Sequence, residues 1–240
     1  MDKRPEMFCY QCQETARNKG CEVVGVCGKR PGTSARMDLL LYAVRGISAI
    51  NRALRGKGLA SREASHEVID ALFTTITNAN FDNASLDDYI RRAFELKTAL
   101  IARAEEHGVG LPSLPQIGFY ATPDEAEKYE SVTGVLADAD PDVRALKQLA
   151  IYGCKGMAAY ARHAANLGYE SDDVYAVIEN AMAETARVDI GVGELLPLVL
   201  AVGSGGVDVM ALLDKANTET YGNPEITKVD IGVRNRPGIL

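Results

Sequence analysis

Residues 39–58 read LLLYAVRGISAINRALRGKG, and residues 149–168 read LAIYGCKGMAAYARHAANLG. After a shift of 110 residues the two stretches match at six of twenty positions. The identical pairs are Leu39/Leu149, Tyr42/Tyr152, Gly46/Gly156, Ala49/Ala159, Arg52/Arg162 and Gly58/Gly168, and Arg45 aligns with Lys155. Both stretches place apolar residues three and four positions apart, as amphipathic helices do. Similarity at a long internal period indicates a duplicated helical unit, although two amphipathic helices could also match by chance.

Helical patterns continue on both sides of each stretch. The first set predicts a helix from Ser34 that stops at Gly56 and Gly58, then helices over 61–78 and 85–107. Ser61 is the expected N-cap of the second helix. The second set predicts helices over 141–167, 171–185 and 193–216, with Pro141 at a permitted first position. A linker rich in Gly and Pro lies between the sets, with a short helix near 125–131.

The predicted fold class is all-α, with two duplicated three-helix bundles and an irregular cluster-binding loop at the N-terminus. Residues 226–233 alternate apolar and polar side chains, as a strand does. Residues 237–240 look like the start of another strand, so we expect the first strands of a truncated α/β domain. The predicted segments are 1–32 (cysteine-rich), 33–108 (first bundle), 109–140 (linker), 141–222 (second bundle) and 223–240 (start of the α/β domain).

Gly46 and Gly156 fall in the middle of predicted helices, where Gly costs about 1 kcal/mol relative to Ala. A missing side chain lets two backbones approach each other closely. We therefore expect both glycines to mark close helix crossings, which is a packing role.

Composition and charge limit the possible partners. The chain has 240 residues, a net charge of −7 and 47 % hydrophobic residues. An acidic surface repels phosphate backbones, which argues against nucleic acid. In the sequence no apolar run approaches the ~20 residues that cross a bilayer, and the polar N-terminus lacks a signal-peptide core. We expect a cytoplasmic protein with no membrane partner and with reduced thiols.

Four of the five cysteines form a motif near the N-terminus. Cys9-Tyr-Gln-Cys12 is followed by eight residues and Cys21, then by five residues and Cys27. Four thiolates can bind a structural zinc ion or an iron–sulfur cluster. Zinc sites usually pair two short Cys-x-x-Cys turns, and here only the first pair is short. The spacing favours a cluster, while zinc, a disulfide pair and free thiols stay open as alternatives.

Other residues near these thiols, or of similar chemistry, have simpler interpretations. Gly20, Gly25 and Gly28 are expected to allow tight turns whose backbone N–H groups point at sulfur. The lone Cys154 is interpreted as a small buried residue. The three histidines, which are far apart in sequence, are interpreted as surface or packing residues. They are His66, His107 and His163.

The cysteine motif resembles the N-terminus of a known family. Residues 7–16 (MFCYQCQETA), then Gly20-Cys21 and residues 26–29 (VCGK), are similar to the hybrid cluster proteins, also called prismane proteins or hydroxylamine reductases. Further similar stretches run to the end of the chain. They are 38–41 (DLLL), 75–80 (TITNAN), Lys155-Gly156, Ala159-Tyr160, His163-Ala164, and Asn217 with 222–227 (GNPEIT).

The resemblance implies a fold, a cofactor and an activity. The family begins with two three-helix bundles, and its branch with closely spaced cysteines binds a cubane [4Fe-4S] cluster. That ligand set falls on Cys9, Cys12, Cys21 and Cys27. Catalysis in the family occurs at a second, hybrid iron–sulfur–oxygen cluster whose ligands lie in downstream domains. No position of this chain matches those ligands, so the resemblance implies no catalytic residue here.

The implied function is therefore one part of an oxidoreductase. The chain would be the N-terminal electron-transfer part of a protein that reduces hydroxylamine or nitric oxide. Its partners would be an electron-donor redox protein and, for the full-length protein, a small nitrogen-oxide substrate. Two alternatives stay open: a stand-alone iron–sulfur electron-transfer or sensing module, and a zinc-stabilised helical interaction domain.

Overall fold

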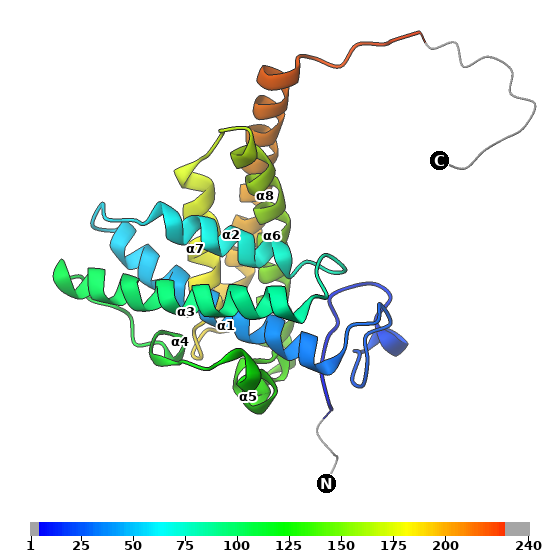
Figure 1. Cartoon of the computed structure of the whole chain (residues 1–240), viewed down its shortest axis with the longest axis vertical. Coiled ribbons are helices and arrows are strands. Elements are labelled where there is room, and N and C mark those ends of the chain that lie inside the picture. The colour runs from blue at the N-terminus through cyan, green and yellow to red at the C-terminus, as the bar shows by residue number, and fades with distance from the viewer. Residues whose placement is uncertain (1–4, 229–240) are drawn as a thin grey trace, which may run out of the picture.

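The computed structural model describes residues 5–228, which are almost entirely helices and connecting loops (Figure 1). No strand is assigned within residues 5–228, where Cys9 and Cys21 form one isolated antiparallel bridge. The predicted all-α class is confirmed. The helices are α1 (Pro31–Arg55), α2 (Arg62–Thr74), α3 (Asn83–Glu106), α4 (Pro115–Gly118), α5 (Ala126–Thr133), α6 (Pro141–Asn166), α7 (Asp172–Thr185) and α8 (Val192–Tyr221), with short 3-10 helices at Ala16–Asn18, Pro123–Glu125 and Val135–Ala137.

Local sequence signals set where most helices begin. The Ser61 hydroxyl accepts a hydrogen bond from the Ala64 N–H, which confirms Ser61 as the N-cap of α2. The Asp140 carboxylate accepts from the N–H groups of the first turn of α6, and Pro141 is the first residue of that helix. Gly58, just after α1, has a φ of +72°. That backbone conformation suits glycine and ends the helix.

Two helix ends differ from the prediction. Helix α2 ends at Thr74, four residues earlier than predicted. The Thr75 hydroxyl donates to the carbonyl oxygens of Ala71 and Leu72, and Asn78 has a φ of +63°, so the chain turns away here. Helix α8 instead runs to Tyr221, five residues beyond its predicted end.

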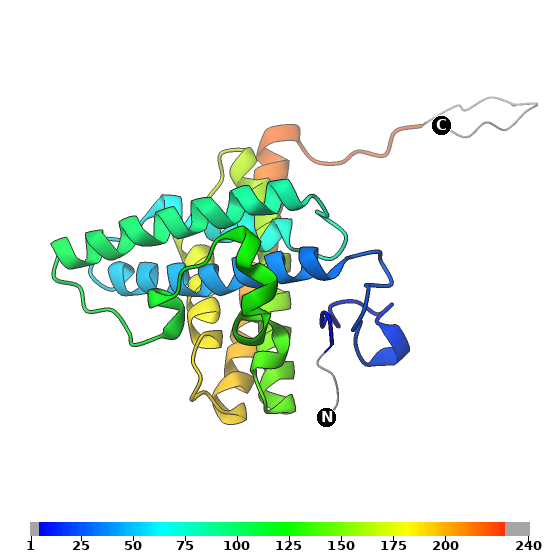
Figure 2. The same ribbon diagram turned by 60° about the horizontal axis from the view of Figure 1, so that its bottom comes forward.

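The helices form two sets that lie across each other. Helices α1, α2 and α3 run across α6, α7 and α8 in both views (Figures 1 and 2). Helix α1 packs on α7, and α2 packs on α6. One continuous buried apolar cluster includes residues from both sets, among them Leu40, Ile47, Ile151 and Val202. The two sets of helices thus share a single core.

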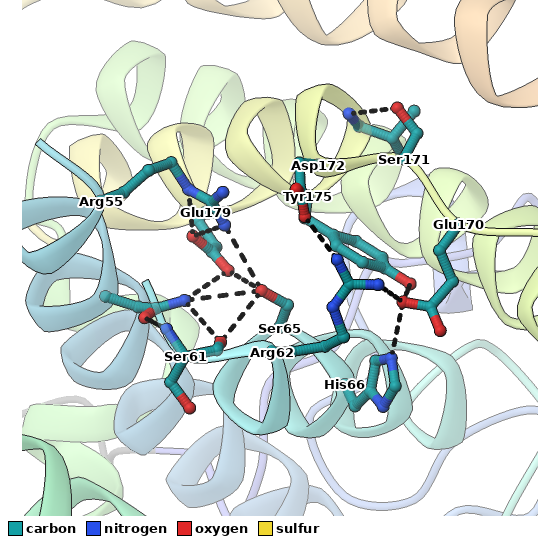
Figure 3. Close-up of polar contacts among 12 residues, drawn as sticks. Arg55, Ser61, Arg62, Ser65, His66, Glu170, Ser171, Asp172, Tyr175 and Glu179 are labelled. Atoms are coloured by element: carbon teal, nitrogen blue, oxygen red, sulfur yellow. Dashed lines mark hydrogen bonds and ion pairs between the residues drawn. The ribbon is translucent and has the colours of Figure 1, made fainter. Parts of the chain in front are cut away.

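A buried carboxylate joins the two sets (Figure 3). Glu179 of α7 has a side chain only 1 % exposed. It accepts hydrogen bonds from Asn51 at 2.8 Å, from Ser65 at 2.6 Å and from Arg55 at 2.9 Å. Because Asn51 and Arg55 belong to α1 and Ser65 to α2, one carboxylate binds three helices. Every oxygen of this buried charge is paired, which is what makes its burial tolerable.

A second, more exposed group of polar contacts lies beside the first (Figure 3). Arg62 pairs with Glu170 at 2.7 Å and with Asp172 at 3.1 Å. His66 and the Tyr175 hydroxyl also contact the Glu170 carboxylate, each at 3.1 Å. These contacts link the start of α2 to the segment that leads into α7.

Helix α8 corrects one statement made from the sequence. By length and composition it could cross a membrane, with a mean hydropathy of 1.9 over its most apolar window, of which 28 % is buried. The prediction that no apolar run approaches that length is therefore wrong. Core helices of soluble proteins can have the same length and apolar composition. Residues Val202, Gly205 and Val209 of α8 are buried, whereas Leu200 and Val207 are exposed.

The end of the chain leaves one prediction open. Residues 223–228 have no assigned secondary structure. Most of the strand predicted over 226–233, and all of the one over 237–240, lie outside the described residues. The predicted segment boundaries likewise stay predictions.

The two corresponding mid-helix glycines have different surroundings. A Cβ atom at Gly46 would lie 2.7 Å from the carbonyl oxygen of Gln116, so only glycine fits against that backbone. A Cβ atom at Gly156 would meet nothing within 4 Å. The expectation of a close crossing at Gly156 is wrong, because this residue faces open space. The close crossing in α6 occurs instead at Gly153, where a Cβ atom would lie 2.4 Å from Val202 of α8.

The two glycines therefore predict opposite effects of the same substitution. Gly46→Ala should destabilise the protein by about 1–3 kcal/mol, because the backbone of Gln116 has to move. Gly156→Ala should be neutral or stabilise by up to ~1 kcal/mol, because Ala favours a helix and meets no neighbour. Urea unfolding followed by circular dichroism measures both. Equal stabilities of the two variants would contradict the packing described here.

The buried and exposed ion pairs also predict different costs. Glu179→Leu should destabilise by about 3–5 kcal/mol, because Arg55, Asn51 and Ser65 lose the carboxylate acceptor that they share. Arg62→Ala, which removes pairs at a side chain 54 % exposed, should cost no more than ~1 kcal/mol. The same unfolding experiment compares them. A loss at Glu179 no larger than that at Arg62 would rule out the proposed role of the buried carboxylate.

Candidate metal centre

The four clustered cysteines lie on a loop that folds back on itself before α1. The N–H and carbonyl groups of Cys9 and Cys21 exchange two hydrogen bonds, of 3.2 and 2.8 Å. Thr15 N–H donates to the Cys12 carbonyl at 3.2 Å, which closes the turn after the Cys-x-x-Cys pair. Met7, buried at the start of the loop, anchors it. Backbone pairing thus brings the first and third cysteines of the motif side by side.

Cys12 and Cys27 meet at a cavity between this loop and the helices. The cavity has a volume of about 670 Å³. The loop contributes 11–14, Val26 and Cys27; the turn after α2 contributes 76–78, and α6 contributes Tyr152, Lys155 and Gly156. The N-terminal loop (blue in Figure 1) therefore lies where the end of α2 and the middle of α6 come together.

The loop glycines act differently from the prediction. The N–H groups of Gly20, Gly25 and Gly28 each donate to a backbone carbonyl oxygen, so the expectation that they point at sulfur is wrong. Gly28 has a φ of +90°, which confirms a tight turn there. A Cβ atom at Gly25 would lie 3.0 Å from the Cys27 sulfur, so this glycine leaves room beside a thiol.

Two buried lysines contact the cysteine loop. The Lys29 ammonium lies 3.8 Å from the sulfur of Cys9 and is the donor to that sulfur. Lys155 of α6 donates to the side-chain oxygen of Gln11 at 3.2 Å and to the Thr75 carbonyl at 2.8 Å. Gln11 belongs to the Cys-x-x-Cys turn, between Cys9 and Cys12 in the sequence. Lys155 therefore ties that turn to both helix sets.

Burial sets the charge of these groups. Desolvation, together with repulsion from Lys29, lowers the pKa of Lys155 to about 7, while Asp38 and Cys9 oppose the shift. Burial raises the pKa of Asp38 on α1 to about 7, against the attraction of Lys29 and Lys155. The cysteine loop thus rests on a buried group of opposite charges at the start of α1.

Sequence reasoning used Lys29 and Lys155 only as part of the family resemblance and assigned neither a role. One further signal was present, because Lys155 aligns with Arg45 in the internal repeat. In α1, Tyr42 stacks edge-on against Phe119, and Gly46 touches Gln116, so the linker covers this face. In α6, the corresponding Tyr152 and Gly156 line the cavity beneath the cysteine loop.

The remaining cysteine and the histidines lie away from the loop. Cys154 is fully buried, and desolvation raises the pKa of its thiol to about 12, which confirms its packing role. His66 contacts Glu170, and His163 stacks edge-on against Phe73. Among residues 5–228, no group of three or more His, Cys, Asp or Glu side chains is arranged to hold a metal ion. That all four loop cysteines are ligands stays a prediction.

The residues present fit an iron–sulfur group by their chemistry. All five cysteines are free thiols, so the four in the loop form no disulfide. A loop of thiolates with glycines beside it and a cationic donor near one sulfur suits an anionic cluster. Cys9, Cys12, Cys21 and Cys27 are the side chains that would hold it.

Comparison with known proteins gives consistent matches. The Prismane/CO dehydrogenase family matches residues 7–240. Three proteins named hydroxylamine reductase are similar to this chain. One from Bacteroides fragilis is 51 % identical over 98 % of this chain, and one from Porphyromonas gingivalis is 48 % identical over 100 % of this chain. One from Desulfitobacterium hafniense is 47 % identical over 98 % of this chain. The matched regions make up 42, 44 and 43 % of those proteins. The chain therefore spans less than half the length of these relatives.

The cavity predicts which thiols a reagent reaches. After treatment with a metal chelator, iodoacetamide at pH 8 should alkylate Cys12 and Cys27 at least about a hundredfold faster than Cys154, whose thiol is buried and protonated. Peptide mass spectrometry measures the rates. Unfolding in guanidinium should make Cys154 as reactive as the others. Rapid alkylation of Cys154 in the folded protein would show that α6 is not packed as described.

Proposed function

Since this chain belongs to the Prismane/CO dehydrogenase family, we propose that it is the electron-entry part of an oxidoreductase of the hydroxylamine reductase type. The relatives that bear this name are more than twice as long as the matched region. The reduction of hydroxylamine or nitric oxide would then be an activity of the whole protein. No residue described in residues 5–228 is proposed as catalytic.

The observation that carries the proposal is the folded-back cysteine loop. Four free thiols lie within 19 residues, and pairing between Cys9 and Cys21 closes the loop over a cavity that Cys12 and Cys27 line. We propose that these four thiolates hold a [4Fe-4S] cluster. Such a cluster accepts and passes on single electrons.

The other residues of the site support the thiolates. The Lys29 ammonium offers a positive charge to the Cys9 sulfur, and Lys155 fixes the position of Gln11. Tyr152 and Ile76 line part of the cavity beside the loop. None of these groups is needed as a proton donor or acceptor, because electron transfer alone is proposed here.

The whole protein would need partners and a reducing environment. An electron-donor redox protein is the proposed source of electrons, and a small nitrogen-oxide species is the proposed substrate. A second, hybrid iron–sulfur–oxygen cluster would be held by residues outside this chain. A cytoplasmic location is part of the proposal, because thiols stay reduced there.

Metal and sulfide analysis tests this proposal directly. The intact protein, purified without oxygen, should contain about four irons and four sulfides that belong to a cluster bound by the four loop cysteines. The Cys12→Ser variant should lose these irons and sulfides. It should also lose the electron paramagnetic resonance signal that the cluster gives after reduction with dithionite. One zinc ion and no sulfide at this site would instead establish a structural helical domain.

Cys154→Ser is the matched control. It removes a thiol from the same helix that contacts the site, but this thiol points into the core. Iron, sulfide and the resonance signal should all be unchanged. Loss of the cluster in this variant as well would mean that the Cys12→Ser result reports misfolding.

A further inference from the structure

Lys29 and Lys155 are buried on the cluster side of the helical core. Lys29 is 4 % exposed and Lys155 is 3 % exposed. Lys29 lies just before α1, and Lys155 lies in the middle of α6, so the chain brings together two ammonium groups that are far apart in sequence. A buried ammonium is costly unless opposite charge or hydrogen bonds compensate it.

Two other buried lysines, Lys147 and Lys97, have partners that compensate the cost of burying their charge. Lys147 pairs with the Asp138 carboxylate at 2.6 Å. Lys97 lies over the rings of Phe94 and Tyr120, with centroid distances of 4.7 and 4.2 Å.

The two lysines at the loop have different surroundings. Both oxygens to which Lys155 donates are uncharged, and the acceptor near Lys29 is the sulfur of Cys9. Asp38 on α1 attracts both lysines; Arg45 also attracts Asp38, and Glu130 repels it. One nearby carboxylate is thus shared by two ammonium groups. The proposed cluster and the thiolates that hold it would supply the remaining negative charge.

We propose that Lys29 and Lys155 are positioning residues that set the reduction potential of the cluster held by the cysteine loop. This inference rests on the proposed function. The reduced form of a cluster carries one more negative charge than the oxidised form. Positive charge carried by two buried side chains beside the cluster stabilises the reduced form, so it raises the reduction potential. Lys155 also holds Gln11, so that the Cys-x-x-Cys turn keeps its place above the ammonium.

Lys97 offers a matched control for the loss of a buried lysine. It is fully buried and donates to the carbonyl oxygens of Gln116 and Phe119. Its side chain touches α1 at Gly46. Gly46 lies 15 residues after Pro31, the first residue of α1, which at 1.5 Å per residue places it about 22 Å away along the helix. Removing the Lys97 charge should therefore leave the reduction potential of the cluster unchanged.

The test is a redox titration of the intact protein, followed by the resonance signal of the reduced cubane. In Lys155→Met and in Lys29→Met, the ratio of reduced to oxidised cluster at a fixed potential should fall about tenfold. Lys155→Arg, which keeps the charge, and Lys97→Met should titrate as the wild type does. Iron and sulfide contents of each variant show that the same cluster is compared.

Each outcome decides between the two claims. Wild-type protein without an iron–sulfur signal would refute the proposed function itself. A normal wild-type signal, with both Met variants titrating at the wild-type potential, would overturn the role of the lysines alone. An equal shift in Lys97→Met would also overturn it. If Lys155→Met fails to fold, Lys29→Met decides by the same comparison.

Discussion

The buried Glu179 carboxylate is the interaction on which the arrangement of helices depends. It accepts hydrogen bonds from α1 and α2 while standing on α7, so it fixes how the two sets of helices cross. A charge in this position tolerates few alternatives, because every rotation of one set against the other would leave it unpaired. The crossing in turn brings the middle of α6 to the start of α1. The cysteine loop lies at that meeting point.

The candidate site therefore combines a loop of local contacts with a rigid base. Within the loop, backbone pairing of Cys9 with Cys21 is local in space and needs no helix. Besides buried Met7, two polar contacts attach it to the base: one from Lys29 to the Cys9 sulfur, and the hydrogen bond from Lys155 to Gln11. Such polar contacts are directional, so they fix the loop geometry more narrowly than apolar packing would. The proposed electron-transfer centre would benefit from these rigid contacts, because its surroundings would move little when the charge of the cluster changes.

Most of the fold could be predicted from the sequence, because its signals are local. Apolar spacing, the Ser61 cap and the Asp140-Pro141 start each depend on a few neighbouring residues. Features that depend on distant partners were missed. The pairing of Glu179 with α1 spans more than 120 residues, and Gly156 could not be told from Gly46 without knowing what covers each. The cysteine motif was visible for the same local reason, whereas the ammonium of Lys155 beside it was not recognised as part of the site.

The corresponding faces of α1 and α6 have different surroundings. The linker packs on Tyr42 and Gly46 of α1, whereas Tyr152 and Gly156 of α6 line the cavity beneath the cysteine loop. The face of α1 is thus filled by ordinary backbone, whereas the corresponding face of α6 opens into the proposed cluster site. Two helices of similar sequence can therefore meet different covering segments. A redox centre in the cysteine loop would then depend on the segment that covers the helix as much as on the helix itself.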